Sequence, residues 1–364
     1  MKLSRNFFLI ALIVMPFTSC IKTEPEPEPS ACNSLTLETK FIFDSEFSDY
    51  EVTKFIETPT GLVYICAEIS GTMDYKMMKM DASLNLIGEF ILPSEKVHDF
   101  VVLSDGRCMI SSYNDTGDIS IIAEDFSSIE RTTLDYLTPP NLMVVNDEII
   151  ITAGSSSYET DIYKFDNGLN EIWHKHWGTS KTYTQHFSSE TNHYYLANDY
   201  NQMLILDFTT GATINTISTN RSIQKIVVHD NYIYATGTVG PNGQCQSDIF
   251  VAKLDETGYE IWSQTCGSPD ADDWGSAVIV YNNKVYVGGL YMENCSAGNF
   301  GGYMNYYLVE FTLDGVKERC YKENGFAYSG LSSLFINSNN ELMSVGSFSN
   351  SEINNFKTKV ARVK

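Results

Sequence analysis

Cysteine is the residue type in this chain with the most definite chemistry, because a thiol can be oxidised, acylated or buried. Two pairs of cysteines have similar separations: Cys245 precedes Cys266 by 21 residues, and Cys295 precedes Cys320 by 25 residues. Each pair begins in a loop and ends on a strand of one repeated unit, so both members lie at the same end of a sheet. We predict disulfides Cys245–Cys266 and Cys295–Cys320; a bridge from Cys245 to Cys295 would contradict this pairing.

Three other cysteines have no predicted bridge. Cys66 and Cys108 lie inside apolar strand segments, which indicates buried thiols that pack as small apolar side chains. No pairing partner for Cys32 can be identified.

Histidine and carboxylate clusters offer metal chemistry, but we predict no metal site. His174 and His176 lie on one face of a strand, a spacing that a metal could use, yet the strand is the outermost of its unit and no third ligand is evident. Asp270, Asp272 and Asp273 could contribute oxygens to calcium, but the run lacks the glycine-assisted turn of a calcium loop and occupies a connector position. The sequence also contains no catalytic signature, so no catalytic residue is assigned.

Aromatic side chains gather in one of the two longest loops, which span residues 239–247 and 291–305 and contain the first cysteine of each predicted pair. The candidate ligand-binding residues are Tyr291, Phe300, Tyr303 and Tyr306. Aromatic faces beside Asn and Gly suit a neutral sugar or a peptide. The alternative is a long surface loop that a disulfide makes rigid.

The elements that would position these residues follow a leader. Residues 1–19 have a basic start and a short apolar run, and Phe17-Thr18-Ser19-Cys20 resembles the lipobox of Bacteroidota lipoproteins, in which the thiol of the cysteine is diacylated. An ordinary signal peptide is the alternative. Residues 20–34 form a Glu/Pro-rich linker, so we expect an outer-membrane lipoprotein whose only membrane contact is its lipid anchor, on the periplasmic or cell-surface face.

Net charge limits the partners. The formal charge is −22, and removal of Lys2 and Arg5 with the leader makes it −24. A strongly negative field repels polyanions, so we predict no nucleic-acid partner.

Residues 35–364 repeat one unit from end to end. Seven apolar registers mark the second strand of each unit, and most follow a turn of Asn, Asp or Gly; they are 62–65, 108–111, 149–152, 194–197, 233–236, 285–288 and 342–345. Their spacing fits the roughly 40 to 50 residues of a four-stranded blade. The last unit ends after its third strand, at 355–363, and an unassigned strand at 35–43 begins the domain. We therefore predict an all-β, seven-bladed β-propeller closed by its N-terminal strand.

The fifth repeated unit and the start of the sixth carry a family resemblance. The segment Ser247–Asp255, followed by Gly258, Trp262 and Val285–Gly289, resembles the bacterial β-propeller repeat family, of PQQ-like repeat type. The run from Leu254 to Gly267 is also similar to the tryptophan-docking motif of quinoprotein dehydrogenases. These resemblances imply a fold, blade-to-blade packing and an extracytoplasmic setting; no cofactor is predicted.

The sequence therefore favours a lipid-anchored propeller that acts as a non-catalytic binding or protein-interaction platform for a glycan, a peptide or a protein. The alternatives are a propeller enzyme, either a quinoprotein-like oxidoreductase or a glycan-acting hydrolase or lyase, and a scaffold for outer-membrane assembly.

Overall fold

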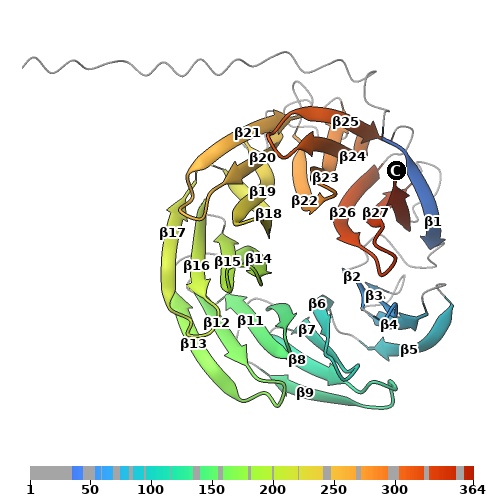
Figure 1. Ribbon diagram of the computed structural model, residues 1–364. Coiled ribbons are helices and arrows are strands. Elements are labelled where there is room, and N and C mark those ends of the chain that lie inside the picture. Colours follow the sequence, from blue (N-terminus) through green and yellow to red (C-terminus); the bar gives the residue numbers. More distant parts are fainter. Residues whose placement is uncertain are drawn as a thin grey trace, which may run out of the picture.

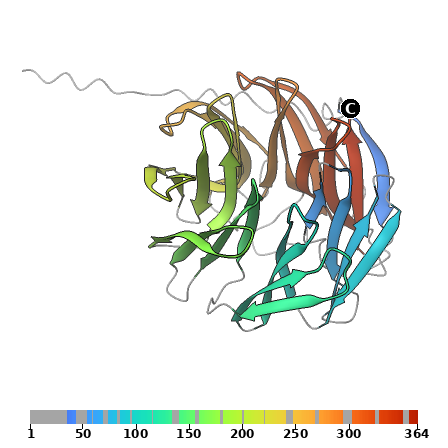
Figure 2. The same cartoon turned by 60° about the horizontal axis from the view of Figure 1, so that its bottom comes forward.

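The computed structural model describes residues 35–43, 54–58, 60–68, 74–81, 85–93, 96–114, 116–133, 140–154, 159–178, 182–198, 201–219, 221–240, 247–267, 272–293, 303–323, 328–349 and 356–364. Seven four-stranded blades are arranged around a central axis (Figure 1). Five of them are separate antiparallel sheets, and blades 6 and 7 join into one eight-stranded sheet through a parallel bridge between Met304 and Tyr328. The view in Figure 2 shows that the sheets stack face to face around the ring. The seven-bladed β-propeller expected from the repeats is confirmed. No helix in the described part of the chain is long and apolar enough to cross a membrane.

Each blade is numbered in chain order, and its strands run from the central axis outwards. Blade 1 contains β2 (Lys54–Glu57), β3 (Val63–Glu68), β4 (Tyr75–Met80) and β5 (Leu86–Leu92). Blade 2 contains β6 (Lys96–Val102), β7 (Cys108–Asn114), β8 (Thr116–Ile122) and β9 (Ile129–Thr133). Blade 3 contains β10 (Asn141–Val145), β11 (Glu148–Gly154), β12 (Thr160–Phe165) and β13 (Glu171–Trp177). Blade 4 contains β14 (Thr182–Ser188), β15 (His193–Asn198), β16 (Gln202–Asp207) and β17 (Thr213–Ser218).

The remaining blades follow the same order. Blade 5 contains β18 (Ser222–His229), β19 (Tyr232–Val239), β20 (Asp248–Leu254) and β21 (Glu260–Cys266). Blade 6 contains β22 (Trp274–Tyr281), β23 (Lys284–Glu293), β24 (Tyr303–Thr312) and β25 (Lys317–Lys322). Blade 7 contains β26 (Tyr328–Ile336), β27 (Leu342–Ser349), β28 (Phe356–Val363) and the N-terminal β1 (Leu37–Phe43).

The N-terminal strand closes the ring, as predicted. β1 pairs antiparallel with β28, from Leu37 opposite Val363 to Phe43 opposite Thr358. Arg362 forms ion pairs with Glu38 of β1 and with Glu341, and the backbone N–H of Leu35 donates to the carbonyl of Cys320 in blade 6. Strand β1 therefore covers an edge that would otherwise be exposed, and it also ties blade 7 to blade 6.

Polar turn residues shape the hairpins between first and second strands. Asn146, Asp147, Asp230 and Asn231 all adopt positive φ between 49° and 65°. These short polar residues tolerate the left-handed region, and two of them in succession give a tight turn that matches the strand twist.

Tryptophans on two outermost strands lock neighbouring blades together. The indole N–H of Trp173 donates to the carbonyl of Phe208 in blade 4, at 3.1 Å, and that of Trp262 donates to the carbonyl of Leu313 in blade 6, at 2.9 Å. Gly315 (φ 83°) faces the second indole so closely that a Cβ there would lie 2.6 Å from Trp262 Cδ2. The motif thus packs blades together, as the resemblance implied.

Candidate functional site

Four cysteines lie within the described residues, and all four are buried on strands. Cys66 and Cys108 are fully buried, and burial raises the pKa of both thiols, to about 12 for Cys108. Cys266 ends β21 and is 2 % exposed, while Cys320 is 5 % exposed on β25 and is disulfide-bonded. Cys245 and Cys295 lie outside the described residues, as do Cys20 and Cys32, so both pairings and the lipidation remain predictions.

Two of the predicted ligand-binding tyrosines pack inside the propeller. Tyr291 is 4 % exposed, its ring lies 5.3 Å from that of Tyr307, and the Lys322 ammonium lies 4.0 Å from its centroid. Tyr306 is 1 % exposed. Phe300 lies outside the described residues, and Tyr303 begins β24, so the loop that they were expected to form is not described.

The two histidines of β13 share one carboxylate. His174 Nε2 and His176 Nδ1 each lie 3.0 Å from Asp161 Oδ1. Burial alone would raise the pKa of Asp161, but the contacts with His174 and His176 outweigh burial and lower it. His174 also stacks on the ring of Tyr163. These contacts of the two histidines are therefore with side chains of the adjacent strand β12.

The aspartates after β21 join blades 5 and 6. Asp272 Oδ1 accepts hydrogen bonds from the hydroxyl and the backbone N–H of Ser247, at 2.7 and 3.2 Å. Asp273 Oδ1 accepts the backbone N–H of Met292 at 2.6 Å, and both carboxylates are fully buried. These contacts are those of a connector between blades, the interpretation that the sequence favoured over a calcium loop.

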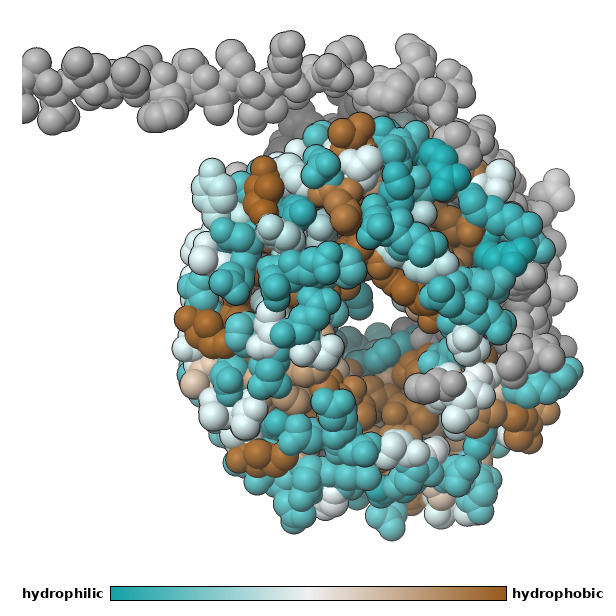
Figure 3. Space-filling view, in the orientation of Figure 1, coloured by the Kyte–Doolittle hydropathy of each residue, from teal (hydrophilic) through white to brown (hydrophobic). Residues whose placement is uncertain are grey.

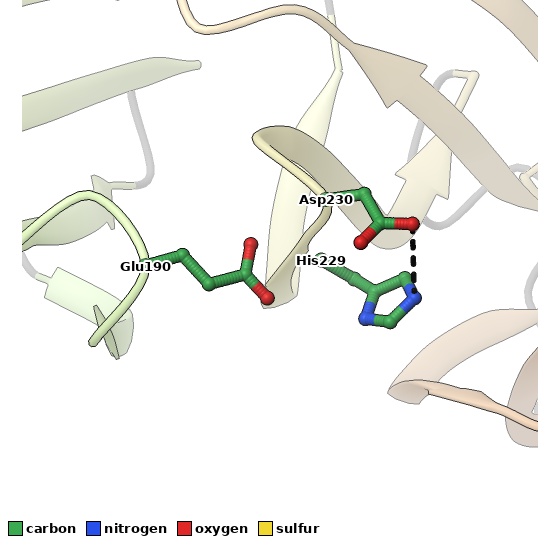
Figure 4. A group of neighbouring side chains, drawn as sticks. All are labelled: Glu190, His229 and Asp230. Carbon is green, nitrogen blue, oxygen red and sulfur yellow. Dashed lines mark ion pairs between the residues drawn. The ribbon is translucent and has the colours of Figure 1, made fainter.

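One further donor cluster lies at two hairpin turns. Glu190, His229 and Asp230 each offer an atom within 4.8 Å of the others, and Figure 4 shows the imidazole beside both carboxylates. His229 Nε2 lies 3.5 Å from Asp230 Oδ2, and Glu190 Oε2 accepts the backbone N–H of Asn231 at 3.2 Å. Both carboxylates are exposed, and exposed acidic groups of this kind are common without a metal, so the cluster alone does not define a metal site.

A cavity with a volume of about 410 Å³ lies between blades 4 and 5. Its walls come from the end of β17, the connection to β18 and the facing sheet of blade 5; the lining residues are Ser218, Thr219, Arg221, Ile223, Ala235, Phe250, Ala252, Leu254, Gly258 and Glu260. The floor is apolar and the rim is polar. This combination suits the binding of an apolar group whose flanks make hydrogen bonds.

An ion pair forms part of the rim. Arg221 Nη1 lies 2.9 Å from Glu260 Oε2, and Nη2 donates to Ser263 Oγ at 3.0 Å. The guanidinium carbon lies 5.3 Å from the centroid of Phe250, so the arginine covers the ring. The two charges compensate each other, and the cavity therefore presents a nearly neutral rim.

Two paired alanines create the cavity. Ala235 on β19 lies opposite Ala252 on β20. At the same register, four other blades carry larger pairs: Ile65 with Met78, Ile151 with Tyr163, Leu196 with Leu204, and Val287 with Val309. Blade 7 carries a small pair, Ser344 with Ala361, but buried Tyr306 of blade 6 packs nearby. The cavity was not anticipated from the sequence, although comparing residue size at this register would have pointed to blades 5 and 7.

Comparisons with known proteins support the fold alone. No protein-family model and no curated protein matches the chain, so membership of the bacterial β-propeller repeat family stays an expectation. A chain in the crystal structure of the mitotic checkpoint complex is 12 % identical, with a TM-score of 0.61, and covers 98 % of this chain and 99 % of its own length. The WD40 β-propeller domain of Doa1 is 10 % identical, with a TM-score of 0.55, and covers 90 % and 97 %. BamB from Moraxella catarrhalis is 13 % identical, with a TM-score of 0.50, and covers 90 % and 100 %. These structures share the propeller architecture with this chain.

Proposed function

We propose that this protein is a lipid-anchored, extracytoplasmic β-propeller that acts as a non-catalytic binding platform for a peptide or protein ligand. The cavity between blades 4 and 5 is the observation that carries the proposal. Its volume of about 410 Å³ lies in the range of roughly 300–1,000 Å³ typical of ligand pockets. It has room for a large apolar side chain and the backbone beside it.

The chemistry of the cavity favours a side chain without charge. Phe250, Leu254 and Ile223 supply an apolar floor, so an aliphatic or aromatic group gains free energy by leaving water. Arg221 and Glu260 already neutralise each other's charge, and a charged ligand group would have to compete with this ion pair. The hydroxyl of Ser218 can serve the polar backbone of the ligand at the rim, whereas the Thr219 hydroxyl already bonds to the backbone of Asn201 and Arg221.

The cellular setting rests on the leader. Lipidation at Cys20, followed by an extended acidic linker, would hold the propeller away from an outer membrane. The resemblance to bacterial β-propeller repeats supports the same setting. The net negative charge supports a ligand other than nucleic acid.

The loop between β23 and β24 is a proposed second contact. Phe300 and Tyr303 lie in or beside this loop in the sequence and would add aromatic surface. Tyr291 and Tyr306 are buried and would not contact a ligand directly. A glycan is the alternative ligand for these aromatics.

Selection of peptides from a displayed library, with a glycan array as the parallel arm, tests the proposal. Two variants block the cavity: Ala252→Leu introduces the residue that blade 4 carries at this register, and Ser218→Trp covers the rim. We expect peptides with an apolar anchor residue and a loss of affinity of at least about tenfold in both variants. Thr213→Trp, at the exposed start of the same strand β17, is the control and should bind normally.

Two results would contradict the proposal. Selected peptides that bind both blocked variants as tightly as the unaltered protein would exclude the cavity. Glycans binding while no peptide does would replace the peptide ligand with a carbohydrate.

A further inference from the structure

The central channel contains a ring of equivalent positions, one from each innermost strand. Strand pairing places them at the same register in all seven blades; they are Lys54, Asp99, Asn141, Thr184, Lys225, Ala277 and Ser333. In five blades the register shifts immediately before this position. Such bulges re-aim side chains, so the ring forms one level of the channel wall. Figure 3 shows the opening at the centre of the molecule.

The side chain of Lys225 reaches into this channel. Lys225 belongs to blade 5, and the charges that act on its ammonium include Lys54 of blade 1 and Asp99 of blade 2. In a ring of seven, blades 1 and 2 lie across the axis from blade 5, as Figure 1 shows for β2, β6 and β18. Lys225 is also exposed although β18 is the innermost strand of its blade, so its side chain opens to the channel.

Lys54 and Asp99 satisfy each other, whereas Lys225 does not share in their contact. Lys54 Nζ lies 2.8 Å from Asp99 Oδ1. The two oxygens of Asp99 also accept the backbone N–H groups of Phe100 and Leu142, at 2.8 and 2.7 Å. Among the residues that the structure describes, Lys225 has no ion pair. Two lysines and one aspartate leave one positive charge at this level of the channel.

The surroundings of Lys225 do not stabilise its ammonium form. Lys225 is exposed to the channel, but the protein that surrounds the channel desolvates its ammonium and lowers its pKa; the charge of Lys54 lowers the pKa further, and Asp99 compensates only in part. His186 of blade 4 adds no charge near pH 7, because its Nε2 accepts the backbone N–H of Val228 and burial lowers the imidazole pKa to about 4. His98 contacts Asn141 and likewise contributes no negative charge.

We infer that the central channel binds a carboxylate group at Lys225, with Lys54 as the second cation and with Asn141 and Ser333 within the same ring. One positive charge matches a monoanion. A phosphate dianion would leave excess negative charge beside Asp99, which repulsion disfavours. This site lies in the channel, goes beyond the proposed function and does not depend on the cavity between blades 4 and 5.

Nuclear magnetic resonance of lysines labelled by reductive ¹³C-methylation tests the inference, because methylation keeps the charge. The resonance of Lys225 is assigned by its loss in Lys225→Gln. N-acetylglycine is the carboxylate probe, its methyl ester is the uncharged comparison, and inorganic phosphate is the second anion. The expected result is a saturable shift of Lys225 with N-acetylglycine, a rise in the pKa of Lys225, and no shift with the ester.

Lys175 is the internal control, since it lies on the outermost strand β13, remote from the channel. Lys175→Gln should leave the saturable shift of Lys225 intact, whereas Lys54→Gln should weaken probe binding at least about fivefold. The resonance of Lys175 begins to shift only when the probe binds lysines non-specifically. If the pKa of Lys225 is still unchanged at that probe concentration, the proposed site is wrong. Stronger binding of phosphate than of N-acetylglycine would overturn the assignment to a carboxylate. Because the cavity variants do not touch the channel, failure here is distinguishable from failure of the proposed function.

Discussion

His186 is a residue whose environment determines how stability depends on pH. It lies on the innermost strand β14, where burial and the neighbouring charge of Lys225 lower its pKa to about 4, compared with about 6.5 in an unfolded chain. As the pH falls, the unfolded chain therefore binds this proton first. The contribution of His186 to stability is complete above pH ~6.5 and is lost as the pH falls towards about 4.

We predict that His186→Gln makes the free energy of unfolding less sensitive to pH. The difference between pH 7 and pH 4 should shrink by up to about 3 kcal/mol, because about 2.5 pKa units are removed. Glutamine keeps an acceptor for the Val228 N–H. Urea unfolding across this pH range measures the effect, and His98→Gln, which removes an exposed channel imidazole, is the control. Parallel pH curves for His186→Gln and the unaltered protein would contradict the prediction.

At the scale of elements, two interfaces between blades depend on a glycine turn against which a tryptophan of the neighbouring blade packs. Gly315 follows β24 with φ 83°, and its open face receives Trp262 of blade 5. Gly211 (φ 69°) receives Trp173 of blade 3 in the same way. These two interfaces therefore need glycine for both the backbone conformation and the close approach.

Gly315→Ala should destabilise the protein by about 2–3 kcal/mol, because the added Cβ meets the indole and strains the backbone. Chemical unfolding followed by tryptophan fluorescence reports on both stability and the Trp262 environment. Gly178→Ala is the matched control, since its Cβ would make only an ordinary contact, 3.8 Å from His176. Equal loss of stability in the two variants would argue against tryptophan docking as the cause.

The hairpin turns could be predicted from the sequence, whereas the cavity between blades 4 and 5 could not. The hairpin turns at Asn146-Asp147 and Asp230-Asn231 were predictable, because their residue types favour positive φ. The cavity was harder to predict, because Ala235 and Ala252 are ordinary core residues within a single blade. Only the comparison with the larger pairs of other blades shows that volume is missing there.

At the scale of the whole molecule, repetition made the architecture predictable while the ligand site was not. Seven apolar registers and a short final unit required an N-terminal strand, and β1 occupies that place. The net charge of the channel could not be predicted from the sequence, because Lys54, Asp99 and Lys225 are far apart in the chain and line the same channel only when the ring closes. Long-range contact of this kind leaves no local pattern.

Deleting residues 30–45 should lower Tm by about 10 °C or more, because the edge of β28 and the ion pairs of Arg362 lose their partners. Differential scanning calorimetry measures the change. Deletion of residues 22–29, which lie in the linker, should leave Tm unaltered. A Tm unaffected by the longer deletion would show that closure by β1 contributes little to stability.

The central claim is that an apolar ligand group enters the cavity between blades 4 and 5. Hydrogen-exchange mass spectrometry of the protein with a selected peptide tests it most directly, because it reports on every blade at once. We predict new protection within 216–223 and 250–260, the segments that line the cavity, and its loss in Ala252→Leu. Protection confined to residues 291–305, with the cavity segments unchanged, would contradict the claim.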